Sequence, residues 1–400
     1  MNIFNTLYCR TLQFVLRSAS KFIYIPKPIV LKNIFDIKKV LKENSLNHPL
    51  IISSKTVSKF DCFISLKNDL NENSIKTIVF NQVKPDPTVL LVNTLVKYYK
   101  DNNCDSIIAY GGGSVIDSAK AMGSVISSNK SINKIKGLLK IHKKLPLLIA
   151  IPTTAGTGSE ATMAAVIINE KNDDKFALTS PYLVPKYTVL DNNNLIYLPQ
   201  SIIANTGIDA LSHALEAYLS RFDDKLSNEY ALKAIKLIHD NLYDFYNDSS
   251  NSFARTNMQE ASYLAGLAFT RVFVGYVHPL AHAVGGKYQL PHGYCIAIFM
   301  PYVLRAYGKK IYKKMEVVSD LLGFDKNLSK YEKTIKVINW IEEMNSNVKI
   351  PKTFDGLIKK SDVESLVKHS IKEAHPFYPV PKILTKSDLK HILDLANKKI

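Results

Sequence analysis

Hydrophobic and polar positions follow two different patterns in the two halves of the chain. Up to about residue 197, short apolar runs alternate with amphipathic stretches such as 88–101. The predicted strands are PLIIS (49–53), TIVF (77–80), SIIAY (106–110), LLIAIP (147–152) and YTVLD (187–191). Strands that alternate with helices form a parallel sheet with helices on its faces. The pattern therefore predicts an α/β domain, Rossmann-like in type, over residues 1–197.

After LPQS at 198–201 the period becomes helical. Pro199 and Ser201 are residues that commonly begin a helix. The predicted helices are 199–220, 226–247, 254–284, 293–306, 309–323 and 329–344. We therefore expect an all-helical second domain over 198–400. No low-complexity linker separates the halves, so we expect them to pack closely and to leave a cleft between them.

The first 35 residues contain no acidic side chain. Apolar residues recur there at helical spacing, which predicts an amphipathic helix over residues 1–20. They are Ile3, Phe4, Leu7, Tyr8, Leu12, Val15 and Leu16. We expect this helix to dock onto the rest of the protein. A targeting presequence or a membrane-surface helix are the alternatives.

Composition excludes several classes of function. The chain is 46% hydrophobic and 22% charged, as ordinary globular proteins are, and no apolar run is long enough for a membrane span. Four scattered cysteines without a CxxC pair indicate a reducing compartment, and we expect the cytoplasm. The net charge is +17, but only six of the 52 basic residues are arginine. Since no nucleic-acid-binding motif accompanies them, we expect no nucleic-acid partner.

The segment IIAYGGGSVIDSAKAMG (107–123) combines a strand, a glycine cluster and a helix. Gly111, Gly112 and Gly113 lack a Cβ, so a phosphate could approach the backbone closely. Ser114 then begins a helix whose free N–H groups favour anions. The segment matches neither GxGxxG nor the P-loop pattern, and a simple tight turn is the alternative.

A second polar loop, IPTTAGTGSEAT (151–162), follows the next long strand. Its hydroxyl groups belong to Thr153, Thr154, Thr157 and Ser159. Capping of a following helix would also explain Thr157 or Ser159. Ligands of open α/β sheets bind at the carboxyl ends of the strands, where both loops are expected.

Three of the ten histidines fall in YVHPLAHAVGGKYQLPHG (276–293), with Lys287 as the one formal charge. His278 and His282 are four residues apart, and so share a helix face. Asp209 and His213 repeat this spacing upstream, and His292 follows a proline. One carboxylate with several imidazoles suits Fe²⁺ or Zn²⁺. Histidines of the core or of helix caps are the alternative.

Four of these segments together resemble the iron-dependent (group III) alcohol dehydrogenases. They are YGGGSVIDSAKAMG, PTTAGTGSEAT, GIDALSHALEAY and VHPLAHAVGGKYQLPHG, in the order and spacing of that family. The resemblance extends from about residue 49 to 306. It implies an N-terminal NAD(P)-binding domain and a C-terminal helical domain with one divalent metal, an architecture shared with dehydroquinate synthase.

The resemblance also implies roles for individual residues. The metal ligands would be Asp209, His213, His278 and His292, and His282 would relay a proton. The cofactor would contact Gly111, Gly112, Gly113, Ser114, Asp117, Thr153, Thr154, Thr157, Ser159 and Lys175. Two positions depart from the family pattern on the cofactor side. Asp86 stands where an asparagine is frequent, and Ser54, followed by Lys55, stands where many NAD-using members have an acid. The missing acid removes repulsion of a 2′-phosphate, so NAD or NADP is expected, with NADP slightly favoured.

The resemblance thus implies a metal-dependent alcohol dehydrogenase or aldehyde reductase. Its expected partners are a small primary alcohol or aldehyde, NAD(P) and one divalent metal, with Fe²⁺ expected first and Zn²⁺ as the alternative. We also expect a homodimer. The alternatives are a polyol (glycerol-type) dehydrogenase, a lyase of the dehydroquinate-synthase type, and a non-catalytic NAD(P)- or metal-binding protein.

Overall fold

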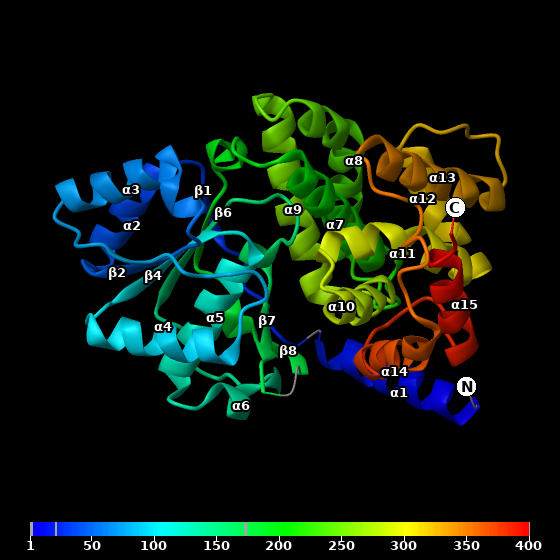
Figure 1. The fold of residues 1–400 in the computed structure, drawn as a ribbon, viewed down its shortest axis with the longest axis horizontal. Coiled ribbons are helices and arrows are strands. Elements are labelled where there is room, and N and C mark those ends of the chain that lie inside the picture. Colours follow the sequence, from blue (N-terminus) through cyan, green and yellow to red (C-terminus); the bar gives the residue numbers. More distant parts are fainter. Residues whose placement is uncertain (1–2, 21, 172–173, 400) are drawn as a thin grey trace. The chain divides into compact units, whose positions relative to one another are not determined.

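The computed structural model describes residues 3–20, 22–171 and 174–399, which form two compact units (Figure 1). The α/β unit comprises Tyr24–Leu198. The helical unit comprises the chain from Pro199 onward together with the N-terminal helix. The predicted change of texture near residue 197 therefore coincides with the start of the helical unit.

The α/β unit is built on a parallel sheet of six strands. Their spatial order is β1 (Ile29–Leu31), β9 (Tyr187–Val189), β6 (Leu147–Pro152), β4 (Ser106–Gly111), β2 (Pro49–Ile52) and β3 (Ile78–Phe80). All five predicted strands belong to it, so the predicted α/β fold is confirmed. β1 was not among the predicted strands. In the sheet, β3 lies on one side of β2, and the next strand in the chain, β4, lies on the other side of β2. Open α/β sheets bind ligands at the carboxyl ends of the strands where the strand order reverses in this way.

Both faces of this sheet are covered by helices, which explains why its strands are continuous apolar runs. Ile51, Ile108 and Ile149 point to one face and pack with α2 (Ile37–Glu43) and α3 (Asp61–Glu72). Their neighbours Ile107 and Leu148 point to the other face. There they pack with α4 (Val89–Asp101) and α5 (Gly113–Ser128). The remaining helix of the unit is α6 (Ile132–Ile135), and its 3-10 turns are η1 (Ile34–Asp36), η2 (Val57–Lys59), η3 (Ser159–Ala161), η4 (Pro181–Leu183) and η5 (Asn192–Leu195).

A second, three-stranded sheet was not predicted. It contains β5 (Gly137–Leu138), β8 (Asp174–Thr179) and β7 (Ala164–Asn169), with β7 and β8 antiparallel. The connection between β7 and β8 lacks the Asn-Gly or Asp-Gly pair that marks a tight hairpin in sequence. This hairpin follows directly on the hydroxyl-rich loop after β6.

The C-terminal half is helical, as predicted. Its helices are α7 (Gln200–Leu219), α8 (Lys225–Asn247), α9 (Ser252–Val272), α10 (Val277–Tyr288), α11 (His292–Tyr307), α12 (Tyr312–Leu321), α13 (Lys330–Asn347), α14 (Val363–Ala374) and α15 (Lys386–Ala396), with 3-10 turns η6 (Gly308–Lys310) and η7 (Lys360–Asp362). The last two helices lie beyond those predicted. The expectation of one helix over 254–284 was wrong, since the structure divides it into α9 and α10.

The break between α9 and α10 has a local cause. Phe273 adopts a left-handed backbone with φ 62°, which ends α9. Gly275 has no room for a side chain, because a Cβ there would lie 2.5 Å from Glu216 Oε1 and 3.0 Å from Tyr307 Oη. Apolar residues continue across the break, so hydrophobic periodicity alone could not reveal it. The break brings the start of α10 against the carboxylate of Glu216.

None of the single helices within residues 3–20, 22–171 and 174–399 is both long and apolar enough to cross a membrane. By length and composition alone, α9 and α10 taken together pass the same test, but they meet at a bend of 106°.

The N-terminal helix α1 (Ile3–Ser20) belongs to the helical unit, so the predicted domain of residues 1–197 needs correction at this end. It docks through polar groups: Arg10 donates to the Val380 carbonyl (2.8 Å), and Gln13 donates to that of Tyr378 (2.8 Å). In contrast, Leu7 and Val15 of the predicted apolar face are exposed. The side chains of Ile3 and Phe4 lie outside the described part.

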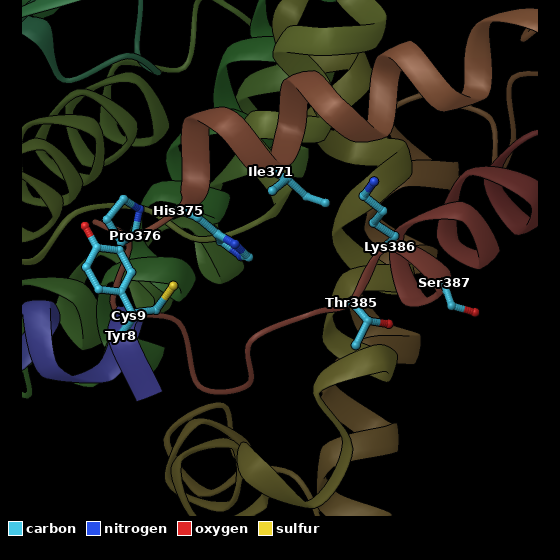
Figure 2. Close-up of a pocket in the computed structure, with 8 residues that line it drawn as sticks. All are labelled: Tyr8, Cys9, Ile371, His375, Pro376, Thr385, Lys386 and Ser387. Carbon is cyan, nitrogen blue, oxygen red and sulfur yellow. The ribbon is translucent and has the colours of Figure 1, made fainter. Parts of the chain in front are cut away.

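A cavity of about 640 Å³ lies beside α1 in the helical unit (Figure 2). Its lining combines α1 with the end of α14 and the start of α15: Tyr8, Cys9, Ile371, His375, Pro376, Thr385, Lys386 and Ser387. None of the residues predicted to bind metal or cofactor lines it. The candidate site therefore lies elsewhere, where the predicted metal-binding side chains converge.

Candidate metal and cofactor sites

Helix α7 presents three ionisable side chains on one buried face. Asp209, His213 and Glu216 follow at intervals of four and three residues, which places them on the same side of a helix. Each of the three residues is at most 6% exposed. Charged and imidazole groups are rarely buried without partners, so this face indicates a built site.

Three helices bring nitrogen atoms to the carboxylate of Asp209. Its Oδ1 atom lies 3.5 Å from His292 Nε2, 3.8 Å from His278 Nε2 and 3.9 Å from His213 Nδ1. One donor atom each from Asp209, His278 and His292 lies within 4.8 Å of the others. His213 is next to this group, with its ring 4.6 Å from that of His278 and stacked on Phe269. All four predicted ligands thus meet at one place.

The donor atoms fit a small cation. Among the described residues, Asp209 Oδ1, His213 Nδ1 and His278 Nε2 are buried and make no hydrogen bond. A buried polar atom without a partner costs about 1–3 kcal/mol. Ligands that share an ion at about 2.0–2.2 Å lie roughly 3–4 Å apart, and the three histidine nitrogens lie 3.5–3.9 Å from Asp209 Oδ1. The set of one carboxylate and imidazoles suits Fe²⁺ or Zn²⁺.

The surroundings keep these ligands in the protonation states that a cation needs. Burial lowers the pKa of His213 and His278 to about 4, so both imidazoles are neutral at pH 7. Burial alone would raise the pKa of Asp209, but His213, His292 and His278 hold it well below its usual value. The cluster therefore offers neutral nitrogen lone pairs around one carboxylate.

Glu216 fixes the orientation of one ligand, and we had not singled it out from the sequence. Its Oε2 lies 2.6 Å from His278 Nδ1, and its Oε1 accepts the Val277 backbone N–H at 2.9 Å. A hydrogen on Nδ1 of His278 is then shared with the carboxylate, which leaves the Nε2 lone pair facing Asp209. Burial raises the pKa of Glu216 to about 7, opposed by the N–H groups of Gly275 and Val277. The sequence did contain a signal for Glu216, because a residue seven positions after Asp209 lies on the same face of a helix.

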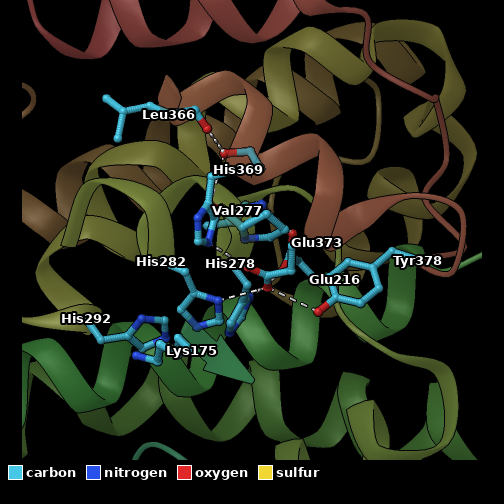
Figure 3. Close-up of polar contacts among 12 residues, drawn as sticks. Lys175, Glu216, Val277, His278, His282, His292, Leu366, His369, Glu373 and Tyr378 are labelled. Carbon is cyan, nitrogen blue, oxygen red and sulfur yellow. Dashed lines mark hydrogen bonds and ion pairs between the residues drawn. The ribbon is translucent and has the colours of Figure 1, made fainter. Parts of the chain in front are cut away.

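His282 is held by a different carboxylate, that of Glu373 on α14 (Figure 3). His282 Nδ1 lies 2.8 Å from Glu373 Oε1, which also accepts the Tyr378 hydroxyl at 3.2 Å. His369 Nε2 lies 3.9 Å from Glu373 Oε2. The ring of His282 stacks on His292 at 4.9 Å, beside the cluster. Glu373 was missed because α14 was not predicted.

Replacing His282 by alanine is expected to leave the bound metal in place while lowering the turnover rate. The reason is that its ring lies beside the ligand cluster and is oriented by Glu373, which suits a proton carrier. General acid–base residues contribute about 10²–10⁴-fold in rate. Metal content and kcat should be measured on the same preparation. Loss of metal equal to that of His278→Ala would make His282 a ligand instead.

In the α/β unit, the two predicted cofactor loops are in direct contact. They follow β4 and β6, which are neighbours in the sheet. A Cβ on Gly112 would lie 3.3 Å from the Thr154 side chain, and one on Gly113 only 2.8 Å from that of Thr157. Thr153 also donates its backbone N–H to the Gly111 carbonyl at 3.2 Å. The glycines therefore let the second loop approach the N-terminus of α5, in addition to leaving room for a ligand.

The other predicted cofactor residues make contacts within the protein. Asp86, at φ 56°, and Lys175 form an ion pair of 3.1 Å. Ser54 follows β2 at the same sheet edge, and its hydroxyl accepts the Val57 N–H at 3.3 Å. Lys55 is exposed. Ser114 lies in the first turn of α5, partly buried. Asp117 and Ser159 bond to each other at 2.6 Å.

Comparison with known proteins agrees with the fold and with the cluster of metal donors. Residues 26–192 match the family model described as iron-containing alcohol dehydrogenase. Residues 203–397 match the model of the Fe-containing alcohol dehydrogenase family, C-terminal. The protein is thus an oxidoreductase that acts on CH–OH groups, and it belongs to the iron-containing alcohol dehydrogenase family.

Individual relatives are similar over most of their length. Alcohol dehydrogenase 4 of Saccharomyces cerevisiae is 33% identical over 358 residues, 89% of this chain and 92% of the relative. The NAD-dependent methanol dehydrogenase of Bacillus methanolicus is 30% identical, covering 89% and 94%. The solved alcohol dehydrogenase from Oenococcus oeni is 30% identical, with a TM-score of 0.90, over 93% of this chain and 99% of that one. The two family models both begin after α1, so this helix lies outside the matched residues.

Proposed function

We propose that the protein transfers a hydride between NAD(P) and a small primary alcohol or aldehyde, with Fe²⁺ held by Asp209, His213, His278 and His292. The observation that carries this proposal is the convergence of donor atoms from α7, α10 and α11 on the buried Asp209 Oδ1. The chemical reason is that a cation held in such a set lowers the pKa of an alcohol and polarises a carbonyl.

In the helical unit, the residues of the proposed site would have separate roles in metal binding and in proton transfer. Asp209 and the three histidine ligands hold the cation, and Glu216 keeps His278 in the tautomer that leaves Nε2 free to bind it. His282 carries the proton that the substrate oxygen gains or loses. Glu373 fixes the orientation of the His282 ring through Nδ1.

In the α/β unit, the proposal assigns the dinucleotide to the carboxyl edge of the sheet. The N-terminus of α5 offers free N–H groups and a partial positive charge to the pyrophosphate. Hydroxyl groups from Thr153, Thr154 and Thr157 are close by, since their loop contacts the glycine turn. Lys175, paired with Asp86, is assigned to the same cofactor. The chemistry of hydride transfer itself belongs to the nicotinamide.

The test is reduction of short straight-chain aldehydes with NADH and with NADPH, followed by nicotinamide absorbance. The protein should be stripped of metal and reloaded separately with Fe²⁺ and Zn²⁺. We expect activity to require the metal, to be higher with Fe²⁺, and to exceed that on glycerol-type polyols. Equal rates with metal-free protein would contradict the proposed ligand set, and faster turnover of polyols would contradict the substrate class.

The choice between NAD and NADP is proposed to depend on Ser54. We expect NADPH to be preferred modestly, because no acid follows β2 to repel a 2′-phosphate. The exposed Lys55 adds a screened attraction worth at most about 1 kcal/mol, or roughly five- to tenfold in affinity. Ser54→Asp should shift the ratio of kcat/KM toward NADH. A wild type that prefers NADH more than about tenfold, with the ratio unchanged in Ser54→Asp, would show that this position does not read the ribose.

We also propose a homodimer in the cytoplasm. The free cysteines Cys9, Cys62, Cys104 and Cys295 support a reducing compartment. Light scattering during gel filtration measures the mass in solution, and a monomer there would contradict this assembly.

A further inference from the structure

We infer that Lys120 and Asp117 are positioning residues for the cofactor: from α5, they fasten the hydroxyl-rich loop after β6 to the glycine turn after β4. This inference rests on the proposed function, since it assumes that the two loops bind the dinucleotide. It goes beyond that function by assigning a role to Lys120, which is not among the residues predicted to bind the metal or the cofactor. It also assigns Asp117 a role in holding the loop rather than in touching the cofactor.

Lys120 is a lysine without exposed surface, and its ammonium group hydrogen-bonds to the loop and to the start of β7. Its ammonium group donates to the carbonyls of Ser159 (2.6 Å), Thr162 (2.8 Å) and Ala164 (2.9 Å), and lies 3.0 Å from the Thr162 hydroxyl. The residue is 0% exposed, which is rare for lysine unless it is fully paired. The three N–H donors of the ammonium group are therefore matched by three carbonyls, and that of Ser159 also accepts the Thr162 backbone N–H at 3.2 Å.

Asp117 is one turn earlier on α5 and holds the same segment from its other side. Its Oδ1 accepts the hydroxyl of Ser159 at 2.6 Å, and its Oδ2 accepts the backbone N–H of Val166 in β7 at 2.9 Å. Both oxygens are thus used within the protein. Because Ser159 donates its hydrogen to Asp117, the oxygen of that hydroxyl keeps its lone pairs for a further donor.

These contacts fix the distance between the N-terminus of α5, which is proposed to bind the phosphates, and the hydroxyl groups of the loop after β6. Because the glycine turn leads directly into α5, a loop that is bonded to α5 keeps its position relative to that N-terminus. The same loop touches the turn at Gly112–Thr154 and Gly113–Thr157, with no space to spare. Lys120 and Asp117 therefore hold the loop hydroxyls and the helix N-terminus as one rigid group. Displacement of binding groups by about 1 Å can cost on the order of 10²-fold.

The group also includes a second buried carboxyl, that of Glu160. Glu160 is 1% exposed, and its Oε1 makes no hydrogen bond within the described part of the chain. Burial lowers the pKa of Lys120 to about 8, while Asp117 and Glu160 act to raise it. Lys120 therefore remains an ammonium at neutral pH, as its contacts with carbonyl oxygens require.

The decisive experiment compares Lys120→Met with Lys130→Met. Methionine keeps the length of the side chain and removes the ammonium, and Lys130 is an exposed lysine just after α5. NADH and NADPH binding should be titrated on metal-free protein, so that the result does not depend on turnover. We expect Lys120→Met to weaken dinucleotide binding at least about tenfold. In separate assays of the metal-loaded protein, it should raise the KM for cofactor more than it lowers kcat. Lys130→Met should bind as the wild type does.

Hydrogen exchange separates positioning from a general loss of structure. In Lys120→Met, the amides of residues 157–166 should exchange faster, while those of α7 and α10 keep the wild-type rate. If that loop exchanges faster but dinucleotide binding is unchanged, the inference is overturned. If the wild type itself binds neither NADH nor NADPH, the proposed function fails instead, and the two failures are thus distinguishable.

A second pair of variants covers the case in which Lys120→Met does not fold. Asp117→Asn and Ser159→Ala, alone and together, form a double-mutant cycle across the 2.6 Å hydrogen bond. If Asp117 acts by holding Ser159, the loss of dinucleotide affinity in the double variant should be no larger than in Asp117→Asn. Additive losses would mean that Asp117 and Ser159 act separately, and would overturn the role of Asp117.

Discussion

His278→Ala is expected to lose the bound metal and the alcohol dehydrogenase activity together. The Nε2 atom of His278 is buried, makes no hydrogen bond among the described residues, and lies 3.8 Å from Asp209 Oδ1. Alanine removes this ligand and leaves one nitrogen donor fewer beside Asp209. We expect metal affinity to fall more than the roughly 10–100-fold that is typical when a residue supporting a ligand is lost. Metal content after dialysis, by elemental analysis, measures this directly.

The control for this variant is dinucleotide binding, which should be unchanged because the proposed cofactor loops belong to the other unit. Glu216→Gln gives an intermediate case. It keeps the shape of the side chain but weakens the contact with His278 Nδ1, so metal affinity should fall about 10–100-fold. Stoichiometric metal in His278→Ala would remove that residue from the ligand set. Wild-type affinity in Glu216→Gln would show that His278 needs no such support.

Gly293→Ala is expected to be the most damaging small substitution in the helical unit. A Cβ at Gly293 would lie 2.0 Å from the backbone oxygen of Asn205 on α7, so α11 has to move away from α7. The preceding residue is His292, whose Nε2 lies 3.5 Å from Asp209 Oδ1, and it has to move as well. Overpacking of this kind costs about 1–3 kcal/mol of stability. Metal affinity should fall in the same variant.

Gly286→Ala is the matched control. Gly286 lies in α10, and a Cβ there would meet nothing within 4 Å. Alanine is the better helix former, by up to about 1 kcal/mol, so this variant should keep its metal and unfold at the same or a higher temperature. Thermal unfolding and metal content of both variants make the comparison. Equal stability of Gly293→Ala and wild type would contradict the close approach of α11 to α7.

The parts of the fold with strong local signals could be predicted from the sequence. The five predicted strands are long apolar runs, and each lies in the parallel sheet. The prediction failed where tertiary contacts decide. The break after Val272 depends on Gly275 lying against Glu216 and Tyr307, which are 59 residues before and 32 residues after it in the chain. The apolar face of α1 predicted that this helix docks. In the structure, however, Arg10 and Gln13 dock it by donating hydrogen bonds to backbone carbonyls near residue 380.

The candidate site likewise contains residues that local sequence spacing could identify and residues that only tertiary contacts reveal. Spacing on one helix was sufficient to pair Asp209 with His213 and His278 with His282, because neighbours at four residues share a face. The same spacing places Glu216 on the face of Asp209 and His213, but its contact with His278, 62 residues away, could not be predicted. Glu373 could not be found in this way, since its partner His282 lies 91 residues away along the chain. Lys120 had no signal at all: a lysine within a helix is normally a solvated residue, and only its contacts with three carbonyls reveal its place.

The position of the metal donors has a consequence for how the protein unfolds. Asp209, His213, His278 and His292 all belong to the helical unit, and they come from three helices spread over more than 80 residues. A cation that binds only when these helices are packed adds its binding free energy to the folding of that unit alone, by about 2.7 kcal/mol at a hundred times its Kd. If these residues hold the ion as proposed, a chelator is therefore expected to lower the melting temperature of the helical unit.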